Sequence, residues 1–169
     1  MDGIFNVNKP IGITSTEVVR KFKRLTGVKR VGHAGTLDPL ASGVLPICVG
    51  KATRVIEYLI DQHRSYRGLI HLGIQTDTFD KEGRIIVENT AYKNPTEREI
   101  LKGLSLFIGD IKQIPPMYSA IKINGDRLYD LARKGITLDL QSRPVQVFDI
   151  SLMNWNPPVV DLKVNCGKG

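Results

Sequence analysis

The sequence predicts an α+β fold, in which helices pack on a mixed and mainly antiparallel β-sheet. Short apolar runs typical of strands occur along the 169 residues, and amphipathic helical patterns lie between them. The last two runs, 145–152 and 159–166, are joined across Asn156-Pro157-Pro158, a connection short enough to favour antiparallel neighbours. Apolar residues make up 41% of the chain, so a globular core is expected and a disordered chain is excluded.

The amino-terminal part of the chain is expected to alternate strand and helix. In order, the elements are a strand at 3–7, a turn at 8–12, a helix at 14–27, a strand at 44–49 and a helix at 52–59. Thr14 followed three residues later by Glu17 is the pattern of a capping box, and Gly27 is typical of a helix end. The apolar stripe of this helix is expected to contain Val18, Phe22 and Leu25.

The remainder of the chain is expected to add five strands and two helices. The strands are predicted at 65–72, 84–88, 117–123, 145–152 and 159–166, the helices at 96–107 and 128–135, and a polar loop at 75–83. Thr96 and Glu99 form a second capping box, and Asn124-Gly125 is a turn signal. Neither an internal repeat nor a linker-like segment occurs, and the length suits one domain or one and a half.

Positive charge is concentrated at the amino-terminal end. The net charge is +7, and residues 1–30 carry seven cations against Asp2 and Glu17. Four of these cations lie off the apolar stripe of the first predicted helix: Arg20, Lys21, Lys23 and Arg24. This asymmetry favours a polyanionic partner, although a solvated helix face would have the same composition.

The two cysteines, Cys48 and Cys166, lie far apart in apolar strand-like runs. They provide neither a disulfide framework nor a metal-ligand spacing, so buried reduced thiols are expected. No window approaches the ~20 apolar residues of a membrane span, and the first residues lack the pattern of a secretory signal. A cytoplasmic protein without membrane association is therefore predicted.

The most unusual window is the glycine-rich loop 32–43, between a basic helix and an apolar strand. Its three glycines permit close approach of the backbone to a ligand, and the loop also contains His33 and Asp38. However, Asp before Pro commonly opens turns, so the residue types alone favour a structural loop. A phosphate-binding loop would end in Gly-Lys-Ser/Thr and a dinucleotide site would contain Gly-x-Gly-x-x-Gly, and this loop has neither.

The histidines argue against metal chemistry, because positions 33, 63 and 71 do not give a His-x-x-x-His spacing. Serine-hydrolase chemistry is disfavoured in the same way, because no serine lies in a Gly-x-Ser-x-Gly sequence.

Residues 32–45 read Gly-His-Ala-Gly-Thr-Leu-Asp-Pro-Leu-Ala-Ser-Gly-Val-Leu. This stretch is similar along its whole length to the active-site signature of the TruB family of tRNA pseudouridine synthases. Further blocks resemble the family in the same order, at 8–15, 64–67 with 76–80, and 113–129. The resemblance covers essentially the whole chain. It implies a pseudouridine synthase fold that is incomplete at its carboxy end.

The resemblance implies an enzyme that isomerises the uridine at position 55, in the T loop of tRNA, to pseudouridine. It makes Asp38 the nucleophile, since a carboxylate can attack either C1′ of the ribose or C6 of the ring, and the sequence leaves that choice open. His33 would lie near the flipped nucleotide. Tyr66 would stack on the uracil and handle the C5 proton, although the strand pattern alone suits a core tyrosine equally well. Substrate-binding roles are also implied for Gly35, Thr36 and Leu37.

The implied partner is tRNA, bound through its T-arm stem-loop by a monomer. Neither a metal nor a small-molecule cofactor is expected, because nothing is oxidised and no group is imported. Phosphate contacts are expected from six cations: Lys9, Arg20, Lys21, Lys23, Arg24 and Arg54.

The family pattern predicts that residues 1–169 are a catalytic domain truncated at its carboxy end. Family members continue into a segment whose arginine pairs with the aspartate, and then into a PUA-like RNA-binding module. A desolvated Asp38 without that arginine would tend to keep its proton, so a weakly active or inactive chain is expected. The alternative is a non-catalytic RNA-binding or tRNA-folding module, which the basic end also suits. A domain that binds a protein partner is a third possibility.

Overall fold

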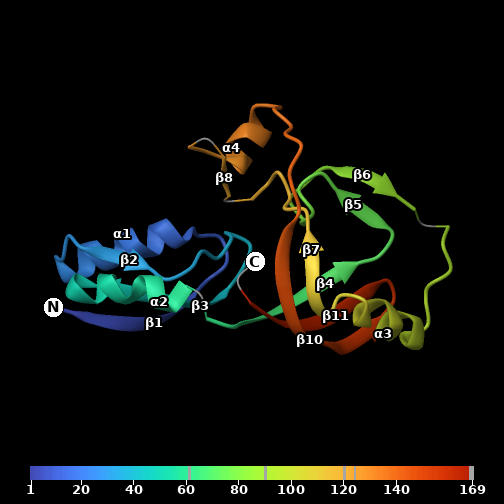
Figure 1. Ribbon diagram of the computed structural model, residues 1–169, viewed down its shortest axis with the longest axis horizontal. Coiled ribbons are helices and arrows are strands. Elements are labelled where there is room, and N and C mark those ends of the chain that lie inside the picture. Colours follow the sequence, from blue (N-terminus) through green and yellow to red (C-terminus); the bar gives the residue numbers. More distant parts are fainter. Residues whose placement is uncertain (61, 90, 120, 124, 168–169) are drawn as a thin grey trace. The chain divides into compact units, whose positions relative to one another are not determined.

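The computed structural model describes residues 1–60, 62–89, 91–119, 121–123 and 125–167. The chain divides into two compact units, residues 1–62 and 63–169, which are described separately (Figure 1). The sequence did not indicate this boundary, and the single catalytic domain stays a prediction. Among the described helices, none combines the length and apolar character needed to cross a membrane.

A three-stranded antiparallel sheet organises the first unit. Its strands are β1 (Gly3–Lys9), β2 (Val31–His33) and β3 (Gly43–Val49), in the order β1–β3–β2. The predicted strands at 3–7 and 44–49 are confirmed. β2 was not predicted, since a three-residue strand is too short to show an alternating pattern.

Helix α1 (Ser15–Thr26) begins and ends where its sequence predicts. The Thr14 hydroxyl accepts a hydrogen bond from the Glu17 N–H at 3.1 Å, and the Glu17 carboxylate accepts one from the Thr14 N–H at 2.6 Å. The hydrogen bonds from the Thr14 main chain and then its side chain lower the pKa of Glu17. Gly27 ends the helix with φ 69°, a left-handed conformation that glycine adopts without strain.

The core of the first unit lies between α1 and one face of the sheet. It is formed by five buried aliphatic side chains: Val18, Val19, Leu45, Ile47 and Val49. Burial of each contributes about 1.5–3 kcal/mol. The predicted apolar stripe is wrong at Leu25, which is 83% exposed, whereas Val19 is buried instead.

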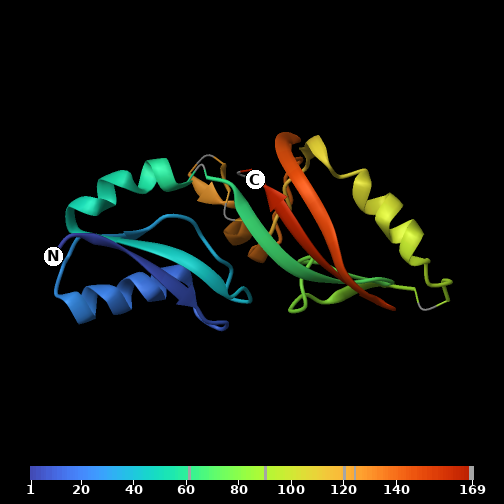
Figure 2. The same cartoon turned by 90° about the horizontal axis from the view of Figure 1, so that it is seen from below.

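The second face of this sheet is covered by a 3₁₀ segment, η1 (Gly50–Val55), followed by α2 (Ile56–Ile60). Figure 2 shows α1 on one side of the strands and η1 with α2 on the other. The helix predicted at 52–59 is therefore α-helical only in its second half. Cys48 lies between Ile47 and Val49 in β3, so its side chain faces the opposite side of the sheet from theirs. Cys48 is fully buried, and desolvation raises the pKa of its thiol.

A four-stranded antiparallel sheet organises the second unit. Its strands are β4 (Arg64–His71), β7 (Gly109–Gln113), β10 (Arg143–Asn156) and β11 (Val159–Cys166), in the order β4–β11–β10–β7. The predicted strand pair near the carboxy end is confirmed as antiparallel, with Ile150 opposite Val164. Each strand pairing of the described residues is antiparallel, so the expected mainly antiparallel arrangement holds.

Smaller elements complete the second unit. They are α3 (Glu97–Ser105), which packs against β10, the pair β5 (Ile74–Thr76) and β6 (Ile85–Glu88), the pair β8 (Lys122–Ile123) and β9 (Asp126–Arg127), and α4 (Leu128–Arg133). The strand predicted at 117–123 is wrong over most of its length, because among its described residues only 122–123 lie in a strand. β5 occupies the start of the predicted loop 75–83. In the predicted turn, Asn124 lies outside the described residues, as does Ala120 in the preceding run.

Candidate active site

The loop that contains Asp38 connects β2 to β3 in the first unit. His33 is the last residue of β2 and lies opposite Ile47 in β3. The loop leaves the sheet with a hydrogen bond from the Ala34 N–H to the Pro46 carbonyl oxygen, at 2.9 Å. Both ends of the loop therefore belong to neighbouring strands, which fixes where it enters and leaves.

Asp38 is exposed within the first unit. Its main-chain carbonyl accepts a hydrogen bond from the Ala41 N–H at 3.0 Å, so Asp38 opens a tight turn. The sequence led us to expect a carboxylate shielded from water, and the first unit does not itself provide that shielding. A carboxylate on an exposed turn is accessible to a large substrate.

The residues on both sides of Asp38 are hydrogen-bonded to the first residue of α1 and to the turn before that helix. The Ser15 hydroxyl accepts from the Leu37 N–H at 3.0 Å and donates to the Leu37 carbonyl at 3.1 Å. The Gly12 N–H donates to the Pro39 carbonyl at 2.8 Å. Sequence reasoning missed Ser15, because a contact between residues 22 positions apart gives no local pattern.

Lys9 does not belong in the predicted set of phosphate contacts. Its side chain is fully buried, and its ammonium donates to the carbonyl oxygens of Pro10 at 3.0 Å and Ile13 at 2.8 Å. A buried ammonium satisfied by main-chain carbonyls is not available to a phosphate. Lys9 instead stabilises the turn that follows β1.

The other predicted cations are accessible. All five of them are exposed, four on α1 and one on η1: Arg20, Lys21, Lys23, Arg24 and Arg54. The exposed face of α1 is thus cationic and its opposite face is apolar, as the sequence predicted. This charge pattern suits a polyanion and also suits solvent.

Two glycines shape the loop and the strand before it. Gly35 has φ 124°, a conformation that side chains rarely adopt. At Gly32 the constraint is steric, because an added Cβ would lie 2.8 Å from Cδ1 of Ile56 in α2. The next two predicted substrate-binding residues differ in burial: Thr36 is exposed, whereas the side chain of Leu37 packs against the core of the unit.

His33 and Tyr66 differ in their surroundings. The His33 ring is half-buried, and its Nδ1 is buried without a hydrogen-bond partner among the described residues. Tyr66 lies on β4 of the second unit, opposite Val164, and is 44% exposed. Tyr66 is therefore not a core residue of that unit, and its ring is accessible for stacking.

Next to Tyr66, Arg67 forms an ion pair across the second sheet. Its guanidinium donates to both carboxylate oxygens of Asp161 in β11, at 3.0 and 2.6 Å. This hydrogen bonding lowers the pKa of Asp161. Successive strand residues point to opposite faces, so Tyr66 and Arg67 lie on opposite sides of β4.

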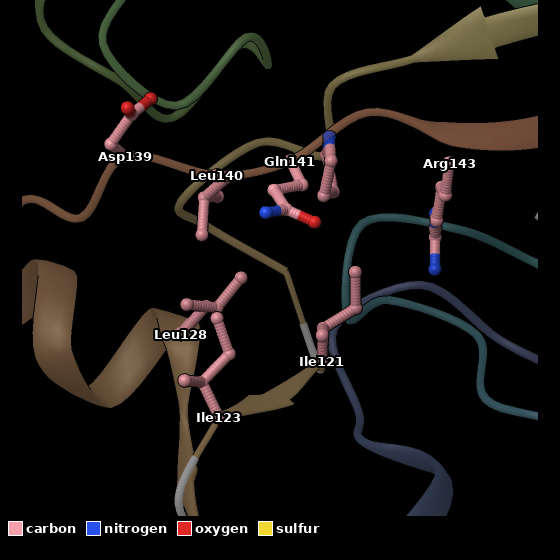
Figure 3. Close-up of a pocket in the computed structure, with 8 residues that line it drawn as sticks. Ile121, Ile123, Leu128, Asp139, Leu140, Gln141 and Arg143 are labelled. Carbon is pink, nitrogen blue, oxygen red and sulfur yellow. The ribbon is translucent and has the colours of Figure 1, made fainter.

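A cavity of about 330 Å³ lies in the second unit, at the base of α4 (Figure 3). Its walls are mainly apolar, from Leu128, Leu140 and two isoleucines, and they also include Arg143, whose Nε is buried without a partner among the described residues. None of the predicted site residues contributes to these walls. Within the described part of the chain, no group of three or more side chains is arranged to hold a metal ion.

Comparisons with known proteins give consistent results. The family model of the TruB family pseudouridylate synthases, N-terminal domain, matches residues 23–169. The tRNA pseudouridine synthase B of Clostridium tetani (strain Massachusetts / E88) is 48% identical over the whole chain, which covers 58% of that relative. The protein of the same name from Haemophilus influenzae is 43% identical over the whole chain, which covers 54% of it. The chain thus spans little more than half the length of these relatives.

Solved structures resemble the chain over 99% of its length. A chain in the crystal structure of a Cbf5-Nop10-Gar1 complex is 30% identical, with a TM-score of 0.73 and 40% of that chain covered. A chain in the structure of an H/ACA RNP bound to a substrate RNA containing 2′-deoxyuridine is 27% identical, with a TM-score of 0.68 and 38% covered. The chain therefore has a pseudouridine synthase fold of the α+β class, as predicted. The chain belongs to the TruB family pseudouridylate synthases, whose N-terminal domain it matches.

Proposed function

We propose that residues 1–169 are the catalytic portion of a tRNA pseudouridine synthase that converts the T-loop uridine at position 55 to pseudouridine. The observation that carries this proposal is that Asp38 lies in the loop between β2 and β3, within residues 23–169 that match the TruB family model, and that the loop sequence resembles the family's active-site signature. Relatives of more than 40% identity are named tRNA pseudouridine synthase B, which supports tRNA as the substrate.

In the proposed reaction, Asp38 acts as the nucleophile at C1′ of the ribose or at C6 of the uracil. The N1–C1′ bond breaks, the ring turns, and a C5–C1′ bond forms. C5 then loses its proton, N1 ends with one, and the carboxylate is released unchanged. Atoms and electrons balance within the nucleotide, so the reaction requires no redox cofactor or donor of a transferred group.

The target base must leave its stack to reach Asp38, at a cost of a few kcal/mol. Tyr66 is proposed to stack on the flipped uracil, which would return about 1–3 kcal/mol, and to handle the C5 proton. Its exposed ring supports this assignment. His33 is proposed to lie near the flipped nucleotide; its ring is half-buried, and its buried Nδ1 has no hydrogen-bond partner among the described residues. Gly35, Thr36 and Leu37 are proposed to bind the substrate beside Asp38.

The cationic face of α1, with Arg54, is proposed to contact tRNA phosphates and so to position the T arm. This face also favours the second candidate function, an RNA-binding or tRNA-folding module without catalysis, because such a module needs the same charges. We further propose that the protein acts as a monomer in the cytoplasm. Both candidates predict tRNA binding that weakens with salt, whereas a domain for a protein partner does not.

The test is conversion of an unmodified T-arm stem-loop by the full-length protein, followed by nucleoside analysis for pseudouridine. Asp38→Asn is expected to lower the rate on the order of 10⁴-fold or more while stem-loop binding remains, because it removes the nucleophile and preserves its shape.

The matched control is Asp110→Asn, which removes an exposed carboxylate from β7 and should leave the rate unchanged. Conversion by Asp38→Asn at the unmodified rate would overturn the nucleophile assignment. Binding without conversion by the unmodified protein would favour the non-catalytic module.

A further inference from the structure

We propose that Ser15 is a positioning residue for catalysis, which holds the backbone on which Asp38 stands. The inference rests on the proposed function, in which Asp38 is the nucleophile. Ser15 itself touches neither substrate nor reacting atoms in this proposal. It acts through Leu37, the residue before Asp38.

The hydroxyl of Ser15 satisfies both main-chain groups of Leu37. Its oxygen accepts from the Leu37 N–H at 3.0 Å, and its proton is donated to the Leu37 carbonyl at 3.1 Å. A serine hydroxyl has one donor and two acceptor positions, so one side chain can make both bonds. Ser15 is 3% exposed, which keeps water from competing for them.

A second hydrogen bond restrains the residue on the other side of Asp38. The Gly12 N–H donates to the Pro39 carbonyl at 2.8 Å. Gly12 and Ser15 belong to one short segment, whose turn is stabilised by the buried Lys9 ammonium through Pro10 and Ile13. The backbone is therefore held immediately before and immediately after Asp38 by the same segment.

Side-chain packing adds a third restraint. Leu37 packs against the core of the first unit, so the residue is fixed by its side chain as well as by its main chain. What remains free at Asp38 is mainly its own side-chain rotation. Catalysis depends on such preorganisation, since a misplacement of 1 Å can cost about 10²-fold in rate.

The helix itself does not need the Ser15 hydroxyl. The N-cap of α1 is Thr14, whose side chain and main chain form the capping box with Glu17. The hydroxyl of Ser15 instead bonds to a loop 22 residues further along the chain. Removal of one hydroxyl at a time therefore separates two effects. Loss of the Thr14 hydroxyl weakens α1, whereas loss of the Ser15 hydroxyl releases the loop that contains Asp38.

The experiment compares Ser15→Ala and Ser15→Cys with Thr14→Ala in the full-length protein. Ser15→Ala is expected to lower kcat on the T-arm stem-loop about 10- to 100-fold, with KM within about twofold of the unmodified value. The kcat of Ser15→Cys should lie between those of Ser15→Ala and the unmodified protein, because a thiol fills the site but is a weak donor and acceptor. Thr14→Ala should lower thermal stability and leave kcat within about twofold.

Amide hydrogen exchange at Leu37 provides a readout independent of activity. It should accelerate in Ser15→Ala and remain slow in Thr14→Ala. Equal kcat values in Ser15→Ala and Thr14→Ala would overturn the inference, as would unchanged exchange at Leu37. If Ser15→Ala does not fold, Ser15→Cys decides by the same criteria. Full activity of Asp38→Asn would instead refute the proposed function, whatever the exchange result at Leu37.

Discussion

At the scale of single residues, Lys9 shows how an ammonium can have a structural role in a basic segment. The sequence places Lys9 among seven cations in residues 1–30, and that context predicts a phosphate contact. The structure instead buries it against two carbonyl oxygens. Charge composition cannot separate these roles, because burial of a lysine depends on the surrounding fold.

We predict that Lys9→Met destabilises the protein by about 2–4 kcal/mol, because two charge-assisted hydrogen bonds are lost and two carbonyls are left unsatisfied. Chemical denaturation measures this change. The slope of log K against log salt for tRNA binding should not change. In the comparison variant, Arg24→Ala, stability should be nearly unaffected and the magnitude of the negative slope should decrease by about 1. A reduced slope in Lys9→Met would restore Lys9 to the phosphate contacts.

At the scale of elements, the two capping boxes were predicted because each is a local pattern with a local cause. Thr14 with Glu17 and Thr96 with Glu99 lie three residues apart, and each pair satisfies main-chain N–H groups at the start of its own helix. No distant contact is needed to form them. Their energetics should therefore respond to changes in these residues alone.

For α1 we predict a stability contribution that depends on pH. The pKa of Glu17 is lowered in the folded chain, so the unfolded state binds more protons at acid pH. The contribution is present above the ordinary value of 4.5 and is lost as the pH falls below it. Glu17→Gln should flatten the fall of the melting temperature with pH in this window. Glu97→Gln, which removes an exposed carboxylate outside both boxes, should retain it.

Elements that depend on distant partners were predicted less well. β2 and β7 exist because β3 and β10 pair with them, and their own sequences show no alternation that marks a strand. The run 117–123 alternates clearly, yet among its described residues only the last two lie in a strand. Strand formation depends on pairing that a single sequence does not display.

At the scale of the whole molecule, the two units have separate sheets, each with its own central strands. β3 is paired on both sides in the first unit, as are β10 and β11 in the second, whereas β1 and β2 are paired to β3 alone among the described strands. Central strands have both rows of main-chain groups satisfied, so their opening requires the largest local unfolding.

Hydrogen exchange measured by mass spectrometry on the 169-residue chain should therefore show the slowest amides in β3, β10 and β11. Among the shorter pairs, β5 and β6 should exchange faster, because a two-stranded ribbon is marginally stable. Exchange in β3 as fast as in β2 would contradict this ordering.

The candidate site was predicted in part. The motif 32–45 and its aspartate were singled out from the sequence, because the motif is continuous and specific. The hydrogen bonding between Ser15 and Leu37 was not identified from the sequence, since it joins two segments that only folding brings together. The exposure of Tyr66 could not be predicted from the sequence either, because the strand pattern fits a core position as well as a surface position. Only the fold shows that its ring is accessible.

Gly32 lies in β2, at the start of the motif that contains Asp38, and its lack of a side chain leaves room for Ile56 of α2. An added Cβ would lie 2.8 Å from the terminal methyl of Ile56, the flexible end of a long side chain. A methyl group introduced at position 32 can therefore be accommodated if one is removed at position 56, as in Gly32→Ala combined with Ile56→Val. The two positions compete for one volume, so the free-energy cost of Gly32→Ala should be smaller in the presence of Ile56→Val than in its absence.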